Sequence, residues 1–282
     1  MIEQFQHKVT NSFMLWFDNY LLKKGQAYSN QSGAFYYYAD DRLDDRFKAF
    51  GSPYKQWVND SSIAGATVPS GVYVGGSFQP RSSSLLLDFT NGRALISGAA
   101  STASVSGSFA VKDFNIYFTN DNEEDLIVDK KYIPNSRIFS AAASYIEPYD
   151  NVVPAIFLSS QSINNTPFAF GGEDTTKIQM KAVVMAENSY QLDGALSIFA
   201  DSFNETFPSI PFSGNPTTEY GDVKNGSYSY DSLKNQYNSE PLFFVEDVVT
   251  SKLSDKARKS LANDLFIGFI DFEIHQQRVH RL

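Results

Sequence analysis

Phenylalanine and tyrosine are spread along the whole chain, and this feature most constrains its fold. The sequence holds 24 Phe and 16 Tyr, set in short segments between Gly, Pro, Ser and Asn. The longest apolar runs, such as 265–270, are far too short to cross a bilayer. Because aromatic residues in short alternating segments favour strands, the pattern predicts a mainly β protein rich in aromatic surface.

The first 25 residues predict an amphipathic helix. Its apolar side chains fall in one arc of roughly 120° at about 100° per residue. Lys23 and Lys24 occupy the last turn, where cations favour the helix dipole, and Gly25 is the expected stop. Two interpretations stay open: the helix packs on its own chain, or it docks on a neighbouring subunit. The residues of the arc are Ile2, Phe5, Val9, Phe13, Trp16, Phe17 and Tyr20.

Residues 31–120 predict strands. The segment 34–38 has the composition of a strand. Asn91-Gly92 lies between two apolar runs, which is the strongest short signal for a β-hairpin. Between residues 105 and 118 the alternation of apolar and polar side chains changes phase near Lys112. One long strand with a bulge or bend at Lys112 would keep both halves on the core.

The second half of the chain predicts further strands and two short helices. Pro154 makes the segment 152–158 an expected edge or terminal strand, because proline cannot donate to a ladder. Asp193 is the expected cap of a helix over 193–203. Residues 207–237 lack periodicity and predict a long loop. The remaining expected elements are strands over 178–184, 242–249 and 265–279 and a helix over 254–263.

Together these segments predict an α+β, mainly β fold with an antiparallel β-sandwich-like core. An N-terminal amphipathic helix and two short helices in the C-terminal half complete it. The expected division is an N-terminal helix and arm over 1–30 and a β-rich body over 31–282. Residues 140–152 are the candidate for a softer boundary within that body.

The charge and composition disfavour several classes of function. A net charge of −9 without a run of Lys or Arg argues against a nucleic-acid binder, although DNA can pass an acidic surface without sticking. The first eight residues do not form a secretion signal, so we expect synthesis in a cytoplasm without export by the chain's own signal. The absence of Cys removes disulfides and thiolate chemistry.

Histidines with catalytic or metal-binding spacing are missing from the sequence. The chain has three His, and none lies near a nucleophile elbow or a phosphate-binding glycine loop. His275 and His280 are five residues apart on an expected strand, so they face opposite sides and form no zinc pair. We therefore expect no catalytic histidine, no cofactor and no metal.

Acidic residues are numerous, but they do not define a site. The segment Asp40–Arg46 holds four acids with oxygen ligands suited to Ca²⁺, yet the interleaved Arg42 and Arg46 neutralise them. A glycosidase needs only two carboxylates, and nothing marks one pair of acids above another. The carboxylates considered for that chemistry are Asp88, Asp113, Glu173 and Asp271.

Segments within the first 180 residues resemble virion structural proteins of tailed bacteriophages. They are Phe13–Asn19 leading to Gly25–Tyr28, Pro53–Trp57 and the turn Pro69–Val74. The resemblance implies a non-enzymatic neck, head–tail connector or tail component that forms a ring of identical subunits around the DNA channel. It also implies virion proteins as neighbours above and below the ring, and assembly in the host cytoplasm.

Aromatic side chains carry much interface energy, so the first helix and the segment 207–237 are the expected contacts between subunits. The expected partners are copies of the chain and neighbouring virion proteins, with DNA only passing through and no membrane or small-molecule substrate. The alternative is a carbohydrate-binding β-sandwich of a host-attachment protein, with Tyr36–Tyr38 or Trp57 lining a groove. A glycosidase is the third hypothesis. The predicted interface residues are Phe5, Val9, Phe13, Trp16, Phe17, Tyr20, Phe212, Tyr220, Tyr228 and Tyr230.

Overall fold

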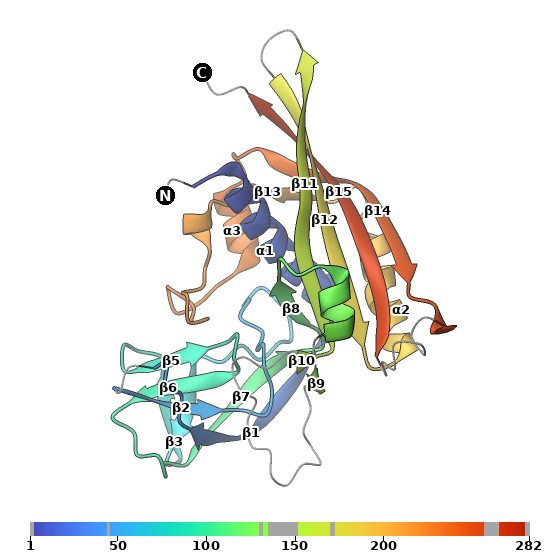
Figure 1. Cartoon of the computed structure of the whole chain (residues 1–282). Helices are drawn as coiled ribbons and strands as arrows, with labels where there is room; N and C mark the ends of the chain where they lie inside the picture. Colours follow the sequence, from blue (N-terminus) through green and yellow to red (C-terminus); the bar gives the residue numbers. More distant parts are fainter. Residues whose placement is uncertain are drawn as a thin grey trace.

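The computed structural model describes residues 3–43, 46–129, 132–134, 152–169, 173–256 and 265–279. The protein is mainly β, with 45% of its residues in strands and 21% in helices, which confirms the predicted fold class. Antiparallel sheets curl into a sandwich-like core. Two bodies, each built on its own sheet, lie on either side of the N-terminal helix (Figure 1).

The first sheet has seven strands in the order β4-β3-β7-β1-β2-β6-β5. Its middle strand β1 is shared, because residues 28–35 pair with β7 and residues 36–38 pair with β2. The rings of Phe35, Trp57 and Phe109 pack together beneath it. The strands are β1 (Tyr28–Tyr38), β2 (Phe47–Gly51), β3 (Gly71–Val74), β4 (Ser77–Pro80), β5 (Leu85–Asp88), β6 (Arg93–Ser97) and β7 (Val105–Lys112).

The second sheet has six strands in the order β13-β14-β15-β12-β11-β8. Each long strand runs antiparallel to its neighbours in the series β11, β12, β15 and β14, whereas β8 runs parallel to β11. Met180, Phe272 and Ile274 are buried on the face toward α1. The other face carries a second buried cluster that includes Phe157, Val183 and Met185. The strands are β8 (Asn115–Phe118), β11 (Ala155–Ala169), β12 (Glu173–Ala186), β13 (Thr206–Pro208), β14 (Leu242–Lys252) and β15 (Phe266–Val279).

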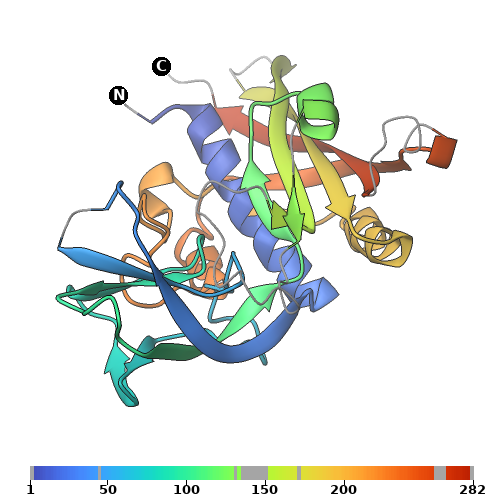
Figure 2. The same ribbon diagram turned by 60° about the horizontal axis from the view of Figure 1, so that its bottom comes forward.

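Helix α1 (Phe5–Gly25) lies between the two sheets (Figure 2). The Phe13 ring meets the Phe272 ring of β15 edge to face, with centroids 5.3 Å apart. Trp16 stacks on Phe207 of β13 at 5.0 Å. One hydrophobic cluster joins this helix to residues of both sheets. The aromatic arc of the helix is therefore buried within its own chain, which decides between the two interpretations of the sequence.

The C-terminal end of α1 shows why a glycine is needed there. Gly25 is the last helical residue, as predicted, but Gln26 adopts the left-handed conformation at φ 48°. A Cβ atom on Gly25 would lie 2.5 Å from Ile198 Cδ1 of helix α2 (Ser189–Ala200). The glycine thus permits the close approach of two helices and is not the left-handed stop.

Helix α2 begins earlier than predicted. Its cap is Asn188, whose side-chain oxygen accepts a hydrogen bond from the Gln191 N–H at 2.8 Å. The predicted cap, Asp193, lies inside the helix and forms an ion pair with Lys252 of β14. Asn and Asp cap helices about equally well, so the sequence does not distinguish these two positions.

The phase change near Lys112 marks a change of sheet. β7 ends at Lys112, and β8 begins at Asn115 in the other sheet, so the predicted single bent strand is wrong. Phe114 between them is buried. A crossing between sheets lets each half bury its own apolar side chains, and a bulge would do the same. The two arrangements therefore share one sequence pattern.

The strand predicted over 152–158 is not an edge strand there. Residues 155–158 pair with β12 on one side and with β8 on the other. Pro154 precedes the first ladder residue, Ala155, so its missing N–H costs no hydrogen bond between β11 and β12. Before it, β10 (Val152–Val153) pairs with β9 (Ile133–Pro134), and a helical turn η1 spans Asp125–Asp129.

The segment predicted as a long loop over 207–237 contains regular structure. Residues 206–208 pair with β14, and a short 3₁₀ helix η2 (Phe212–Gly214) follows. Helix α3 (Tyr230–Gln236) is capped by the Ser229 side chain. A helix of seven residues is too short to show two turns of periodicity, so the sequence pattern gave no sign of it.

Several other predictions are confirmed. The Asn91-Gly92 turn joins β5 to β6, and Gly92 has φ +63°. The strands predicted over 178–184, 242–249 and 265–279 are parts of β12, β14 and β15. The division expected at residue 30 falls within β1. Ile2, nearly all of the softer boundary at 140–152 and most of the helix expected over 254–263 lie outside the described residues.

Candidate functional site

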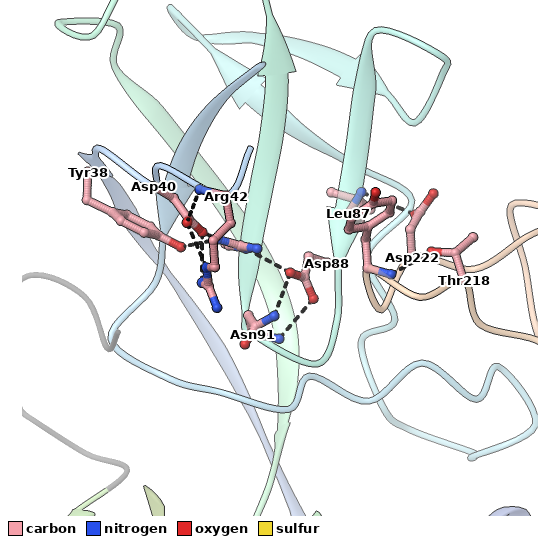
Figure 3. A network of polar contacts seen from close by, with 10 residues as sticks. Tyr38, Asp40, Arg42, Leu87, Asp88, Asn91, Thr218 and Asp222 are labelled. Carbon is pink, nitrogen blue, oxygen red and sulfur yellow. Dashed lines mark hydrogen bonds and ion pairs between the residues drawn. The ribbon is translucent and has the colours of Figure 1, made fainter. Parts of the chain in front are cut away.

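Arg93 is the centre of a buried network of charges in the seven-stranded sheet. Figure 3 shows its partners Tyr38, Asp40 and Asp88. Its Nε donates to Asp88 Oδ2 at 2.7 Å, and its Nη1 donates to Asp40 Oδ2 at 2.6 Å. The same Nη1 donates to the Tyr38 hydroxyl at 2.6 Å. Asp88 and Arg93 stand opposite each other across the hairpin turn. The hairpin register therefore places this ion pair, and β1 brings Tyr38 and Asp40 to it.

The environment of the network shifts two pKa values in opposite directions. The Arg42 side chain, which donates to Asp40 at 2.9 Å, lowers the pKa of that carboxyl, and Arg93 adds to the effect. Burial raises the pKa of Tyr38 to about 12. Both acids are held by guanidinium groups, so neither carboxylate is available as a base. The network of Tyr38, Asp40, Asp88 and Arg93 therefore has a structural role, and we call it the clamp.

A second ion pair fixes the segment 215–223 against β5. Arg81 Nη2 donates to Asp222 Oδ2 at 2.8 Å, and the Leu87 N–H donates to Asp222 Oδ1 at 3.2 Å. Figure 3 shows Asp222 beside Leu87 and Thr218. Gly221 has φ +78°, and a Cβ atom there would lie 2.5 Å from Asp88 Oδ1. The segment therefore packs directly against the first network.

A small cavity of about 170 Å³, lined by both polar and apolar side chains, lies where α1 meets the seven-stranded sheet. Lys112 Nζ donates to Asp18 Oδ1 at 2.6 Å on its wall. Burial raises the pKa of Asp18, and the Lys112 ammonium opposes that rise. The side-chain oxygens of Asn11 and Asn59 line the cavity without a partner in the described chain. The small volume and these two amide oxygens suit ordered waters better than a substrate.

The acids considered for glycoside hydrolysis do not converge. Glu173 pairs with Val279, whereas Asp271 lies eight residues back along β15, which is roughly 27 Å at 3.4 Å per residue. A glycosidase pair needs about 5–9.5 Å. Asp88 is held by Arg93 in the other sheet, and Asp113 is exposed in the crossing between sheets. These four residues therefore provide no acid–base pair.

His275 is the one described histidine with acidic neighbours close to its ring. Its Nε2 lies 2.9 Å from Glu273 Oε1 and contacts Glu246 Oε2. His7 instead accepts a hydrogen bond from the Gln4 N–H at the start of α1, and His280 lies outside the described residues. The sequence places Glu273 and His275 on one face of β15. It gives no sign that Glu246 of β14 joins them, because strand register is not visible in it.

Most of the predicted interface residues are core residues of this chain. Phe5 is half-buried, and its ring lies 3.8 Å below the Arg278 guanidinium. Phe212 and Tyr220 are exposed at 59% and 53%. This burial corrects the assignment of the α1 face to an intersubunit contact, because the facing surfaces are α2, β13 and β15 of the same chain. The buried members are Val9, Phe13, Trp16, Phe17, Tyr20, Tyr228 and Tyr230.

Three exposed aromatic rings share the outer face of the seven-stranded sheet. Tyr73 and Phe78 lie opposite each other in the β3–β4 hairpin with centroids 5.4 Å apart. Ala34 and Tyr73 both stand opposite Ser106, so their side chains share one face of the sheet. Tyr36 lies two residues after Ala34 in β1 and therefore faces the same side. Trp57, expected at such a surface, is buried.

No protein-family model matches this chain, and no curated protein is significantly similar to it in sequence. None of the described helices combines the length and apolar character that a membrane span requires.

Proposed function

We propose that the chain is a non-enzymatic structural protein of a tailed-bacteriophage virion and forms part of an oligomeric ring in the neck or tail. Its partners are copies of itself and neighbouring virion proteins. DNA passes without specific binding, for which the net charge of −9 is suitable. The sequence resemblance to phage virion proteins supports this class, and the open edges of the six-stranded sheet support assembly.

The open edges are the observation that carries the proposal. β8 covers β11 only as far as Leu158, and the described residues beyond it have no partner on that side. On the opposite side, among the described residues, β13 and the two residues before it cover β14 only as far as Val245. Pro167 lies on the open part of β11, where a residue without an N–H is tolerated. Both open edges are strands that accept another strand by backbone hydrogen bonds.

Two different edges on one sheet suit a repeating assembly. Pairing β11 of one subunit with β14 of the next is a heterologous contact, which closes into a ring when the rotation between subunits permits it. Exposed apolar residues lie near the β14 edge, including Val249 at 53% and Leu242 at 48%. These residues give the contact an apolar component beyond the backbone hydrogen bonds.

The direction of the free N–H groups on β14 defines a sharp test. The Leu253 N–H donates to Ile267 O at 3.0 Å. Because backbone N–H groups alternate in direction along a strand, the N–H groups of Val249 and Ser251 also point toward β15. The intervening Thr250 therefore points its N–H and C=O toward the open edge. Thr250→Pro removes that outward N–H donor and leaves the hydrogen bonds to β15 intact. Thr250→Ala keeps the N–H donor.

Native mass spectrometry and light scattering of the purified chain carry out this test. We expect a single closed oligomer for the unmodified chain and for Thr250→Ala, and a monomer for Thr250→Pro. A monomer at the highest soluble concentration of the unmodified chain would contradict the proposal, as would an oligomer unaffected by Thr250→Pro.

The exposed aromatic patch of Tyr36, Tyr73 and Phe78 supports a second candidate, a carbohydrate-binding module of a host-attachment protein. Exposed rings on a flat β face can stack against sugar rings by their apolar surfaces. A glycan array separates this candidate from the first. It predicts binding that Tyr73→Ala abolishes, and no binding to any glycan would reject it.

A further inference from the structure

Three ligand-type side chains converge on the outer face of the six-stranded sheet. One atom from each of Glu246, Glu273 and His275 lies within 4.8 Å of the other two. His275 is the best covered of the three, with 18% of its side chain exposed. The cluster stands at the rim of an open groove whose wall includes Leu242, Phe244 and Gln277.

The third ligand of the cluster lies at a β-bulge in β14. Val245 pairs with Ile274, and Asp247 pairs with Glu273. Glu246 is therefore the extra residue of β14, and its carboxylate contacts the His275 ring. In a regular ladder Glu246 would stand directly opposite Glu273, and at the bulge Asp247 takes that position instead. Glu246 still lies beside both Glu273 and His275. Bulges occur often beside functional sites.

The chemistry of the cluster matches a divalent transition metal. Imidazole nitrogen together with carboxylate oxygen suits Zn²⁺ and similar ions, whereas Ca²⁺ and Mg²⁺ prefer oxygen alone. Two carboxylates and a neutral imidazole balance the two charges of the ion. Ligand atoms around tetrahedral zinc lie roughly 3.4 Å apart, given metal–ligand bonds of about 2.0–2.1 Å. Small side-chain rotations from the present arrangement reach that geometry.

Lys177 supports one of the ligands from the other side. Lys177 stands opposite His275 in the β12–β15 register. Its Nζ donates to Glu273 Oε1 at 2.6 Å. This bond orients the carboxylate, and the same Oε1 lies 2.9 Å from His275 Nε2. Hydrogen bonds to ligating carboxylates commonly serve this purpose.

We propose that Glu246, Glu273 and His275 form a site for a Zn²⁺-like divalent ion. The ion cross-links β14 to β15 at the bulge, and its fourth position faces the groove, where water occupies it. This site does not depend on the ring, because all three ligands come from one chain.

Titration of the full chain with Zn²⁺ in a calorimeter tests the site. We expect one strong site per chain, and at least tenfold weaker binding for Glu246→Gln and for His275→Gln. Glu187→Gln is the matched control, because Glu187 is an exposed acid before α2, away from the cluster. Its affinity should equal that of the unmodified chain.

Nuclear magnetic resonance identifies the ligand directly, since the chain has only three histidines. Zn²⁺ should shift the imidazole resonances that disappear in His275→Gln, and those of His7 should stay in place. Unchanged His275 resonances at saturating Zn²⁺ would overturn the proposal. So would equal affinities for the unmodified chain and Glu246→Gln.

Discussion

The rings of Phe17 and Phe199 stack with centroids 4.0 Å apart and an angle of 14° between their planes. This contact fixes α1 to α2, and both rings are fully buried. The aromatic face of the N-terminal helix therefore stabilises the fold of its own chain. The surface left for other molecules lies on the sheet edges and outer faces.

Phe17→Ala tests this role. The loss of a fully buried ring should lower the free energy of unfolding by about 3–5 kcal/mol, from lost burial and the cavity that remains. Urea unfolding measures the change. Tyr190→Ala is the control, because Tyr190 is 88% exposed and its loss should cost less than about 0.5 kcal/mol. Equal effects of the two substitutions would mean that α1 is not held by this contact.

Arg93→Met should be among the most destabilising single changes in the seven-stranded sheet. It leaves Asp88 buried without its cation, and breaking a buried pair in this way costs about 3–5 kcal/mol. Adding Asp88→Asn to Arg93→Met should recover part of the loss, because the unpaired charge is then removed.

Lys23→Met is the matched control for Arg93→Met. It removes one side of the exposed Lys23–Asp231 pair, and such pairs contribute about 0–1 kcal/mol. Urea unfolding measures the free energy of unfolding of Arg93→Met, of Arg93→Met with Asp88→Asn, and of Lys23→Met. A cost for Arg93→Met no greater than that for Lys23→Met would show that the clamp contributes nothing.

Gly221→Ala tests how tightly the segment 215–223 packs on the clamp. The substitution forces a side chain into φ +78° and places a Cβ atom 2.5 Å from Asp88 Oδ1. Gly75→Ala is the matched control, because Gly75 has φ +58° and open space around it. Backbone strain alone should cost about 1 kcal/mol at Gly75, and Gly221→Ala should cost clearly more. Equal losses in thermal unfolding would show that the contact with Asp88 is loose.

The pKa of Tyr38 predicts a loss of stability in alkali. Burial raises this pKa from the usual value near 10 to about 12, so the unfolded chain releases the proton first. The stability from the neutral Tyr38 hydroxyl is fully present below pH 10 and is lost as the pH rises to 12. The free energy of unfolding falls by about 2–3 kcal/mol over this range.

Urea unfolding at pH 9 and at pH 11, compared between the unmodified chain and Tyr38→Phe, measures this loss. Tyr38→Phe loses a hydrogen bond from Arg93 at both pH values, but its stability should fall less between them. Tyr190→Phe should behave like the unmodified chain. Parallel pH dependences for Tyr38→Phe and the unmodified chain would contradict the assignment.

Much of the secondary structure was predictable from local patterns. The helix ending at Gly25, the Asn91-Gly92 hairpin and the alternating strands 178–184 and 265–279 follow from periodicity and turn chemistry over a few residues. These signals need no knowledge of the partner strand. The helix α3 was missed because its seven residues are too few to show periodicity. The cap at Asn188 was missed because Asp193 could serve equally.

The arrangement of the sheets and sites was not predictable in the same way. The crossing at Lys112 and a bulge give the same change of phase, and only the pairing of strands distinguishes them. Glu246 lies beside His275 because of the register in which β14 pairs with β15. The burial of Tyr228 and Tyr230 depends on contacts with α1 and Asp60, which are far away in the sequence.

Hydrogen exchange of the backbone N–H groups of β14 tests the central claim most directly. The Val249 and Ser251 N–H groups, which face β15, should be protected both in the separated subunit and in the assembled protein. The Thr250 N–H should exchange fast in the separated subunit and become protected on assembly. Fast exchange of Thr250 in an assembled particle would contradict the account, because the open edge of β14 would then remain unpaired.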